Sequence, residues 1–322
     1  MTAPVVVAAR GLQKSYGEVV AVRGIDFEIG AGEFFGFLGP NGAGKTTTMS
    51  MLQAVARRTG GQLEVLGLDP AVDGKRIRQR IGVCPQEDNL DPDLQVRDNL
   101  LVYARYFGVP RREARRRAQE LLALMQLEHK ADVAVSELSG GMKRRLTLAR
   151  SLVNEPELVI LDEPSTGLDP QARHLIWQKL RQLRERGCTL LLTTHYMDEA
   201  ERLCDRLVVM DRGRILASGA PAALIEEHVG REVVELTLPF AGSSATPPEE
   251  TSTGREAEDV ALRLELTPVR SGDQWVFFFR DPADPRLDRL TQHARQRAWS
   301  CRVRRAGLED VFLQLTGREL LD

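Results

Sequence analysis

A glycine-rich stretch that ends in a lysine and a threonine is the part of this sequence best suited to chemistry. Residues 39–46 read Gly-Pro-Asn-Gly-Ala-Gly-Lys-Thr, between an apolar run and a helix-forming segment. Glycines let backbone amides curl around phosphate oxygens, and the helix that follows points its positive end at them. Lys45 adds a charge for the terminal phosphates, and the Thr46 hydroxyl suits Mg²⁺. The stretch therefore predicts a site for ATP with Mg²⁺, built from Gly39, Pro40, Asn41, Gly42, Ala43, Gly44, Lys45, Thr46 and Thr47.

Two acidic residues follow a second apolar run, at residues 158–161. An apolar strand delivers Asp162 and Glu163 to its C-terminal end, which is where parallel sheets bind ligands. Asp162 would hold the metal, and Glu163 would orient or deprotonate the attacking water. An apolar strand that ends in Asp-Glu is common by itself. Together with the phosphate loop, it predicts a nucleotide hydrolase.

Short apolar runs alternate with helical segments over the first 225 residues or so, which positions these groups. We expect strands at 5–9, 26–29, 34–38, 81–83, 158–161 and 189–192, and helices at 46–56, 112–125 and 175–186. Continuous apolar runs are typical of strands that are covered on both faces. The order strand–helix–strand implies parallel strands with a right-handed crossover, and hence an α/β fold.

Composition changes after about residue 230, which suggests two domains, 1–230 and 231–322. Residues 241–254 are rich in Ser, Thr, Pro and Gly, so we expect a flexible loop over about 241–257. Strands are expected at 260–266 and 274–279, a helix at 287–298 and a short amphipathic element at 308–315. These elements would form a small α+β domain, with the aromatic residues at 275–279 in its core.

Charge and cysteine content limit the classes of function. The chain has 44 Lys and Arg against 46 Asp and Glu, so no global basic field favours nucleic acid. The four cysteines are too far apart for a metal knuckle or a redox pair, which fits a reduced compartment. No apolar stretch approaches the length that spans a bilayer, so we expect a cytoplasmic chain with no direct membrane insertion. A basic run at 111–117 is either a solvated helix face or a phosphate- or lipid-headgroup site.

Residues 138–145 read Leu-Ser-Gly-Gly-Met-Lys-Arg-Arg, which resembles the signature sequence of ABC transporter ATPases. The resemblance covers residues 5–224 and implies a P-loop nucleotide-binding domain with a mixed sheet and a helical subdomain at about 87–157. It implies that Tyr16 stacks on adenine and that Gln86 approaches the metal and the water. It also implies that Asp169 lies in a loop between protomers and that His195 senses the γ-phosphate. The metal set that follows is Thr46, Gln86 and Asp162, and the catalytic set is Glu163, His195 and Gln86.

The signature turn further implies that the protein works as a pair. A glycine-rich turn that opens a helix is a phosphate site. In this family the turn closes on ATP held by a second protomer, so a homodimer is expected. The residues predicted to make that contact are Ser139, Gly140 and Gly141.

Residues 99–108 and 308–318 resemble one branch of the family, the exporters with type-2 permeases. Residues 172–177 and 194–205 are most similar to nodulation-factor exporter ATPases. This implies a separate membrane permease, a position on the inner face of the cell membrane and an amphipathic drug, lipid or glycolipid-like substrate. Two alternatives remain: a soluble ABC ATPase that acts on the ribosome or nucleic acid, and a P-loop module that binds ATP without turnover. The presence of both Glu163 and His195 argues against the second.

Overall fold

The computed structural model describes residues 4–238, 252–271 and 274–318. The chain divides into two compact units, Met1–Ser218 and Gly219–Asp322, which we describe separately. The domain boundary near residue 230, which is expected from composition, remains a prediction. Among the described residues, no helix is both long and apolar enough to cross a membrane.

A six-stranded sheet runs through the first unit in the order β5-β6-β7-β3-β8-β9. Its strands are β3 (Phe34–Leu38), β5 (Ile81–Cys84), β6 (Leu158–Asp162), β7 (Thr189–Thr194), β8 (Arg206–Asp211) and β9 (Arg214–Gly219). Strand β3 pairs in parallel with β7 and β8, and β6 pairs in parallel with β5 and β7. Every residue of β3 and β7 is buried, as expected of continuous apolar runs in a parallel sheet.

A second, antiparallel sheet packs against the first. It has the order β2-β1-β4, with β1 (Val5–Tyr16), β2 (Val19–Gly30) and β4 (Gly60–Val65). Phe27 of β2 meets Phe35 and Phe37 of β3, at ring-centroid distances of 6.3 and 5.0 Å. The strands of this sheet therefore share one hydrophobic core with the parallel sheet.

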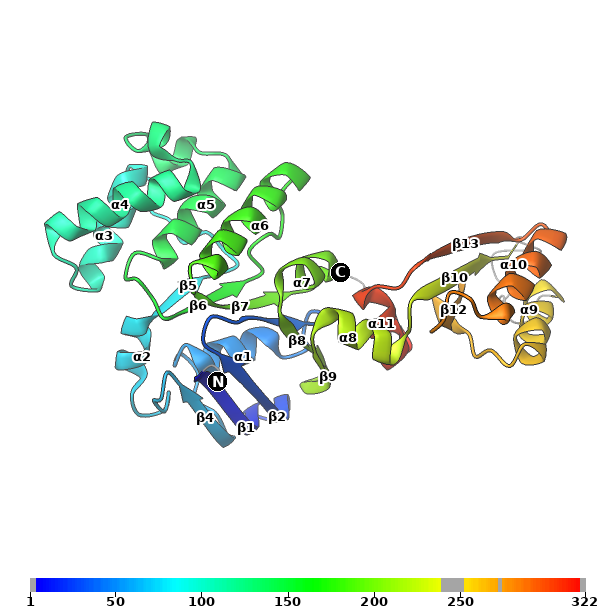
Figure 1. Cartoon of the computed structure of the whole chain (residues 1–322). Coiled ribbons are helices and arrows are strands. Elements are labelled where there is room, and N and C mark those ends of the chain that lie inside the picture. Colours follow the sequence, from blue (N-terminus) through cyan, green and yellow to red (C-terminus); the bar gives the residue numbers. More distant parts are fainter. Residues whose placement is uncertain (1–3, 239–251, 272–273, 319–322) are drawn as a thin grey trace. The chain divides into compact units, whose positions relative to one another are not determined.

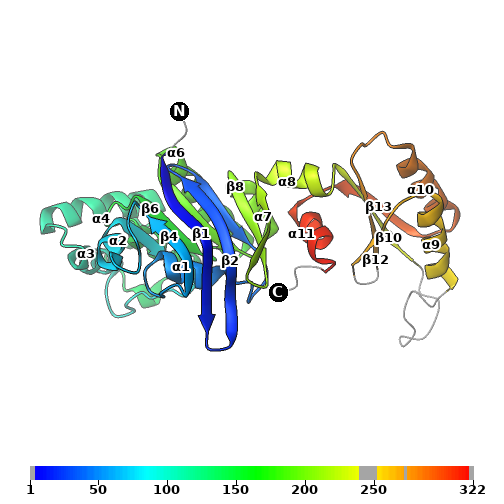
Figure 2. The same cartoon turned by 90° about the horizontal axis from the view of Figure 1, so that it is seen from below.

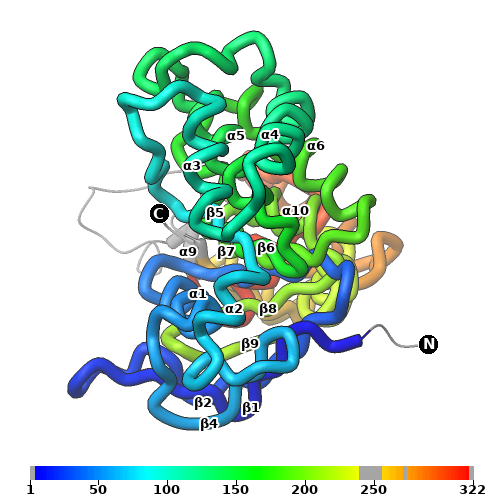
Figure 3. The backbone as a smooth tube through the Cα atoms, turned by 90° about the vertical axis from the view of Figure 1, so that its left-hand side faces the viewer, coloured from blue at the N-terminus to red at the C-terminus, as the bar shows by residue number. Residues whose placement is uncertain are grey.

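Helices complete the first unit in two groups. Those nearest the sheets are α1 (Lys45–Leu52), α2 (Gly74–Arg80), α6 (Pro170–Glu185) and α7 (Met197–Leu203). A helical part follows β5 and comprises α3 (Val96–Tyr106), α4 (Arg111–Met125), the short 3₁₀ turns Glu128–Lys130 and Val135–Glu137, and α5 (Gly140–Ser151). Figures 1 and 3 show α3, α4 and α5 gathered on the side of the parallel sheet away from β1, β2 and β4.

The second unit is a four-stranded antiparallel sheet with helices. The strand order is β11-β12-β10-β13, with β10 (Glu232–Thr237), β11 (Val269–Ser271), β12 (Gln274–Phe279) and β13 (Ser300–Arg305). Helices α9 (Ser252–Arg263) and α10 (Pro285–Gln296) lie side by side over it, and α8 (Pro221–His228) and α11 (Leu308–Thr316) complete the unit (Figures 1 and 2). Trp275, Phe277 and Phe279 are buried in the core, as the sequence predicts. Phe278, which is also expected there, is only half-buried.

One element of the second unit differs from the prediction. The strand expected at 260–266 is wrong, because α9 extends through Arg263. Ala257, Val260 and Ala261 are buried, and the spacing of three and four residues places them on one helical face. The helix also covers residues 252–257, where composition favoured a loop, whereas residues 241–251 of that loop lie outside the described part.

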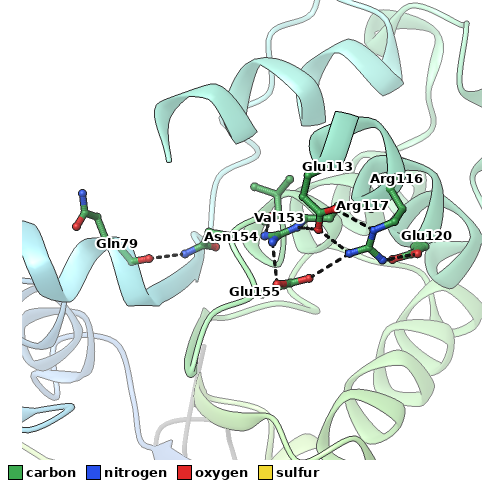
Figure 4. Close-up of polar contacts among 8 residues, drawn as sticks. All are labelled: Gln79, Glu113, Arg116, Arg117, Glu120, Val153, Asn154 and Glu155. Atoms are coloured by element: carbon green, nitrogen blue, oxygen red, sulfur yellow. Dashed lines mark hydrogen bonds and ion pairs between the residues drawn. The ribbon is translucent and has the colours of Figure 1, made fainter. Parts of the chain in front are cut away.

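An ion-pair network in the helical part uses two arginines of the basic run (Figure 4). Arg116 pairs with Glu113 and Glu120, at 2.5 and 2.7 Å. Arg117 pairs with Glu113 at 2.7 Å and with Glu155, which follows α5, at 2.8 Å. These two arginines therefore link α4 to the segment after α5. The remaining arginines of the run are exposed: Arg111, Arg112 and Arg115.

Arg304 makes the ion pairs that attach α11 to the sheet of the second unit. Its guanidinium bonds Glu235 at 2.6 Å and Asp310 at 2.7 and 2.8 Å, and Asp310 is only 1% exposed. Arg304→Ala would leave that carboxylate buried without its charge partner, so we expect a loss of about 3 kcal/mol in the free energy of unfolding of this unit. Hydrogen exchange of the β10 and β13 amides in the full chain measures it. Arg305→Ala, at an exposed neighbour, is the control, and equal protection in both variants would contradict the prediction.

Candidate active site

The phosphate loop connects the buried strand β3 to α1, which begins at Lys45. Two of its glycines are needed for close approach of the backbone. A Cβ on Gly39 would lie 2.1 Å from the Met210 carbonyl oxygen, and one on Gly44 would lie 2.6 Å from that of Ala21. Gly44 also has φ 103°, in the left-handed region that favours glycine. The loop is therefore pressed between β8 and β2 with its backbone shape set by glycine.

The ammonium group of Lys45 is buried and held by the loop itself. Its Nζ donates to the carbonyl oxygens of Gly39 at 2.6 Å and Pro40 at 3.1 Å, and lies 3.8 Å from Glu163 Oε1. Burial lowers the pKa of Lys45, and the charges of Glu163 and Asp162 oppose that shift. The lysine is thus fixed beside two carboxylates, with carbonyl contacts that phosphate oxygens can replace.

The two carboxylates stand at the end of β6, between β5 and β7. Asp162 accepts a hydrogen bond from the Thr193 hydroxyl of β7. Burial raises the pKa of Asp162, while that hydrogen bond and the charge of Lys45 lower it. The backbone of Glu163 has φ 45°, a conformation that is uncommon outside glycine and that recurs at functional sites. Its amide donates to the Thr193 carbonyl oxygen at 3.0 Å, which holds this turn against β7.

Glu163 is the point at which the predicted catalytic residues meet. Gln86 Nε2 donates to its Oε2 at 3.3 Å, and the Thr166 hydroxyl donates to the same oxygen at 3.2 Å. His195 Nδ1 lies 3.1 Å from its Oε1, which is also the oxygen nearest Lys45. The side chain of Glu163 is 8% exposed. The ends of β5, β6 and β7 thus bring an amide, a carboxylate and an imidazole together, and the phosphate loop after β3 adds the ammonium group of Lys45.

Among the described residues, the two that cap α5 and α6 are not part of this cluster. Ser139 caps α5, with its hydroxyl accepting from Met142 N at 3.3 Å, and Asp169 caps α6 by accepting from Ala172 N at 2.9 Å. A Cβ on Gly141 would lie 3.0 Å from Ala172 Cβ, so the two helix starts are neighbours. Within the described residues, neither cap bonds Lys45 or Glu163. Ser139 and Gly140 are exposed.

Tyr16 lies at the end of β1 and is 52% exposed, with Lys14 Nζ 4.5 Å from its ring centroid. The adjoining strand β2 reaches the phosphate loop, because Ala21 and Val22 lie next to the Cβ position of Gly44. The hairpin therefore presents a half-exposed aromatic ring, with the Lys14 ammonium group over it, on the strand pair that borders the loop.

Comparison with known proteins agrees with this geometry. The chain is 50% identical over 316 residues to a protein of Paraburkholderia xenovorans named Nod factor export ATP-binding protein I, with 97% of each chain covered. The chain belongs to the ABC transporter ATP-binding proteins. Proteins of the same name from Burkholderia pseudomallei and Ralstonia nicotianae are 49% and 46% identical, over 97% and 98% of this chain and 97% and 95% of theirs. Residues 22–166 match the family model of the ABC transporter, and residues 251–317 match that of the nodulation factor export protein NodI C-terminal domain.

Solved structures confirm the fold class of this ABC ATPase. An ATP-binding subunit of an ABC transporter has a TM-score of 0.63 and 28% identity, covering 69% of this chain and 92% of its own. A dimeric ATP-binding cassette in a post-hydrolysis state, bound to ADP and Pi, has a TM-score of 0.61 and 28% identity over 66% and 98%. The predicted α/β cassette with a helical part is therefore confirmed. The protein is an ATP-binding and ATP-hydrolysing transporter subunit.

Glu199 is a buried carboxyl group behind the catalytic cluster that the sequence analysis missed. It is 0% exposed on α7, and its Oε1 accepts from Trp177 Nε1 at 3.0 Å. Burial raises its pKa, and polar contacts with Thr194, Ser165 and Trp177 oppose the rise. Thr194 immediately precedes His195 in the sequence, and Ser165 follows Glu163 by two residues. A glutamate in a short charged helix gives no sequence signal that it is buried.

The raised pKa of Glu199 predicts a pH-dependent stability. Because the folded-state pKa lies above the ordinary value of 4.5, this carboxyl stabilises the fold fully below pH 4.5 and loses that contribution as pH rises through the folded pKa. Glu199→Gln removes the titration and keeps an acceptor for Trp177. In urea titrations, we expect the difference in free energy of unfolding between this variant and the parent to shift in favour of the variant as pH rises above 4.5. Glu185→Gln, exposed on α6, should follow the parent at every pH, and parallel profiles for Glu199→Gln would refute the assignment.

Proposed function

We propose that this ABC ATPase powers export of an amphipathic, glycolipid-like molecule through a separate type-2 membrane permease. The observation that carries the proposal is the match of the whole chain, C-terminal unit included, to proteins named as Nod factor export ATP-binding protein I. The chain itself would lie at the inner, cytoplasmic face of the cell membrane, held there by the permease. A ribosome- or nucleic-acid-directed ATPase is not favoured by these relatives.

The proposed hydrolysis centre follows from the contacts of Glu163. This carboxylate would orient or deprotonate the attacking water, since it is buried and lies within reach of Gln86 and His195. Lys45 would bind the terminal phosphates, and His195 would sense the γ-phosphate. Tyr16 would stack on the adenine ring through its exposed face.

The residues proposed for Mg²⁺ are Thr46, Gln86 and Asp162. They offer a hydroxyl, an amide oxygen and a carboxylate, which are hard oxygen donors of the kind that Mg²⁺ prefers. In the described part of the chain, no cluster of three or more His, Cys, Asp or Glu side chains is arranged for a metal. That fits an ion held by few protein ligands together with substrate phosphates. When bound, Mg²⁺ would neutralise developing phosphate charge.

The signature turn supports a homodimer as the working form. Ser139 and Gly140 are exposed at the start of α5 and do not bond the phosphate loop of their own chain, although a glycine-rich helix start suits phosphate. ATP bound at one phosphate loop would be closed over by Ser139, Gly140 and Gly141 of a second copy. The loop that ends at Asp169 would lie at the same interface.

A groove between α3 and α4 is the proposed contact for the permease. It has a volume of about 320 Å³ and an apolar floor that includes Leu101 and Val102. Arg105, Arg111 and Arg115 line it against a single acid, Asp98. An amphipathic helix with acidic residues would satisfy both its apolar floor and its positive rim.

The test is a pull-down of the tagged chain from detergent-solubilised membranes, with the ATPase rate measured on what elutes. A polytopic membrane protein that co-elutes and raises the rate supports the proposal. Arg115→Glu should weaken the co-elution, whereas Arg112→Glu, an exposed arginine outside the groove, should not. A chain that elutes alone or with ribosomes would leave it an ATPase but defeat the transport proposal.

A further inference from the structure

Arg144 of α5 is a buried arginine whose donor groups are all used. Its side chain is 4% exposed, and its Nη1 lies 3.6 Å from Asp88. A guanidinium carries five N–H donors in a rigid fork. Here each donor meets one backbone carbonyl oxygen, and the five acceptors are those of Pro85, Gln86, Asp162, Glu163 and Pro164.

The five carbonyls belong to two separate segments of the active site. Nη1 holds the segment after β5, with 3.1 Å to the Gln86 oxygen. Nη2 and Nε hold the end of β6, with 3.0 Å to the Glu163 oxygen and 2.6 Å to that of Pro164. The same helix also binds the first segment through Thr147, whose hydroxyl donates to Asp88 at 3.0 Å.

We propose that Arg144 is a positioning residue for ATP hydrolysis, which fixes the backbones of Gln86 and Glu163 relative to each other and to the signature helix α5. The inference rests on the proposed roles of Gln86 and Glu163. Their side chains meet at 3.3 Å, although the two residues are 77 positions apart in the sequence. The turn at Glu163 has a left-handed backbone, which needs support from its surroundings. The guanidinium supplies that support at the Glu163 carbonyl oxygen, whereas Thr193 bonds the Glu163 amide.

The planar arrangement of donors in the guanidinium, rather than its charge, joins the two segments. A lysine has three donors on a flexible stem and binds as a point charge, so it does not span two segments in a fixed geometry. Arg144→Lys should therefore leave the charge beside Asp88 but release one or both carbonyl sets. Misplacement of catalytic groups by about 1 Å costs up to about 100-fold in rate. Nucleotide binding depends on the phosphate loop, which Arg144 does not contact.

The experiment compares steady-state ATP hydrolysis by the full chain and by Arg144→Lys and Arg144→Gln. Rates are divided by the number of sites that bind a fluorescent ATP analogue, so that unfolded protein does not count. We expect kcat to fall about 10-fold or more in both variants, with KM for ATP within about twofold of the parent. Arg145→Lys is the matched control, since Arg145 of the same helix donates to Met125 and Gln126 carbonyls of the helical part instead.

Three results would overturn the inference: a normal kcat per binding site in both Arg144 variants, an equal fall in Arg145→Lys, or a rise in KM with kcat unchanged. Glu163→Gln, assayed beside them, separates this inference from the proposed function. If that variant is inactive and the Arg144 variants are normal, only the positioning role fails. If Glu163→Gln hydrolyses ATP normally, the assignment of Glu163 itself fails.

Discussion

Glu163→Gln should abolish most ATP hydrolysis and leave ATP bound between two copies of the chain. The amide keeps the size of the side chain and its contacts with Gln86 and Thr166, but it does not accept a proton from water. Loss of a general base costs about 100-fold to 10,000-fold in rate, so we expect a fall of that size in kcat. ATP that is bound but not cleaved would hold the dimer closed, because binding of ATP and binding of the partner favour each other. Size-exclusion chromatography with ATP should show the dimer.

The control for this variant is Glu157→Gln, just before the start of the same strand. Glu157 is 53% exposed and pairs with Arg80 at 2.6 Å, away from the nucleotide. It should keep the parent rate. Normal hydrolysis by Glu163→Gln would show that another group activates the water. An inactive variant that stays monomeric with ATP would keep the base assignment but contradict the shared site.

Lys45→Ala should remove nucleotide binding or turnover. Lys45 is the buried cation of the phosphate loop, and alanine would leave the acids Asp162 and Glu163 facing the phosphates without it. Loss of one such electrostatic contact costs about 100-fold or more in rate. The measurement is the Kd for a fluorescent ATP analogue together with the hydrolysis rate.

Lys75→Ala, at an exposed lysine of α2, is the matched control and should bind and hydrolyse ATP as the parent does. Unchanged binding and turnover in Lys45→Ala would refute the phosphate-loop role. A change of the same size in both lysine variants would point to the overall charge instead of the loop.

Local patterns accounted for the elements that carry the site. The strand at 34–38, the strand at 158–161 and the helix at 112–125 agree with β3, β6 and α4 to within a residue. Each is a continuous run whose apolar content or periodicity is visible over a few residues. The prediction failed over the C-terminal part of α9. Five of the seven residues at 260–266 are apolar, and such a run resembles a strand unless the core that it faces is known.

The sequence by itself determined the chemistry of this protein. The phosphate loop, the acidic pair and the signature turn are contiguous motifs, and their backbone geometry depends on nearby glycines and caps. The tertiary structure alone decided the support for that chemistry. These supports are the hydrogen bond from Thr193 to Asp162, the buried Glu199 with its partner Trp177, and the guanidinium of Arg144. They join residues that are 18 to 59 positions apart in the sequence. Such contacts depend on how strands and helices pack, and a buried polar side chain shows no signal in the sequence until its partners are known.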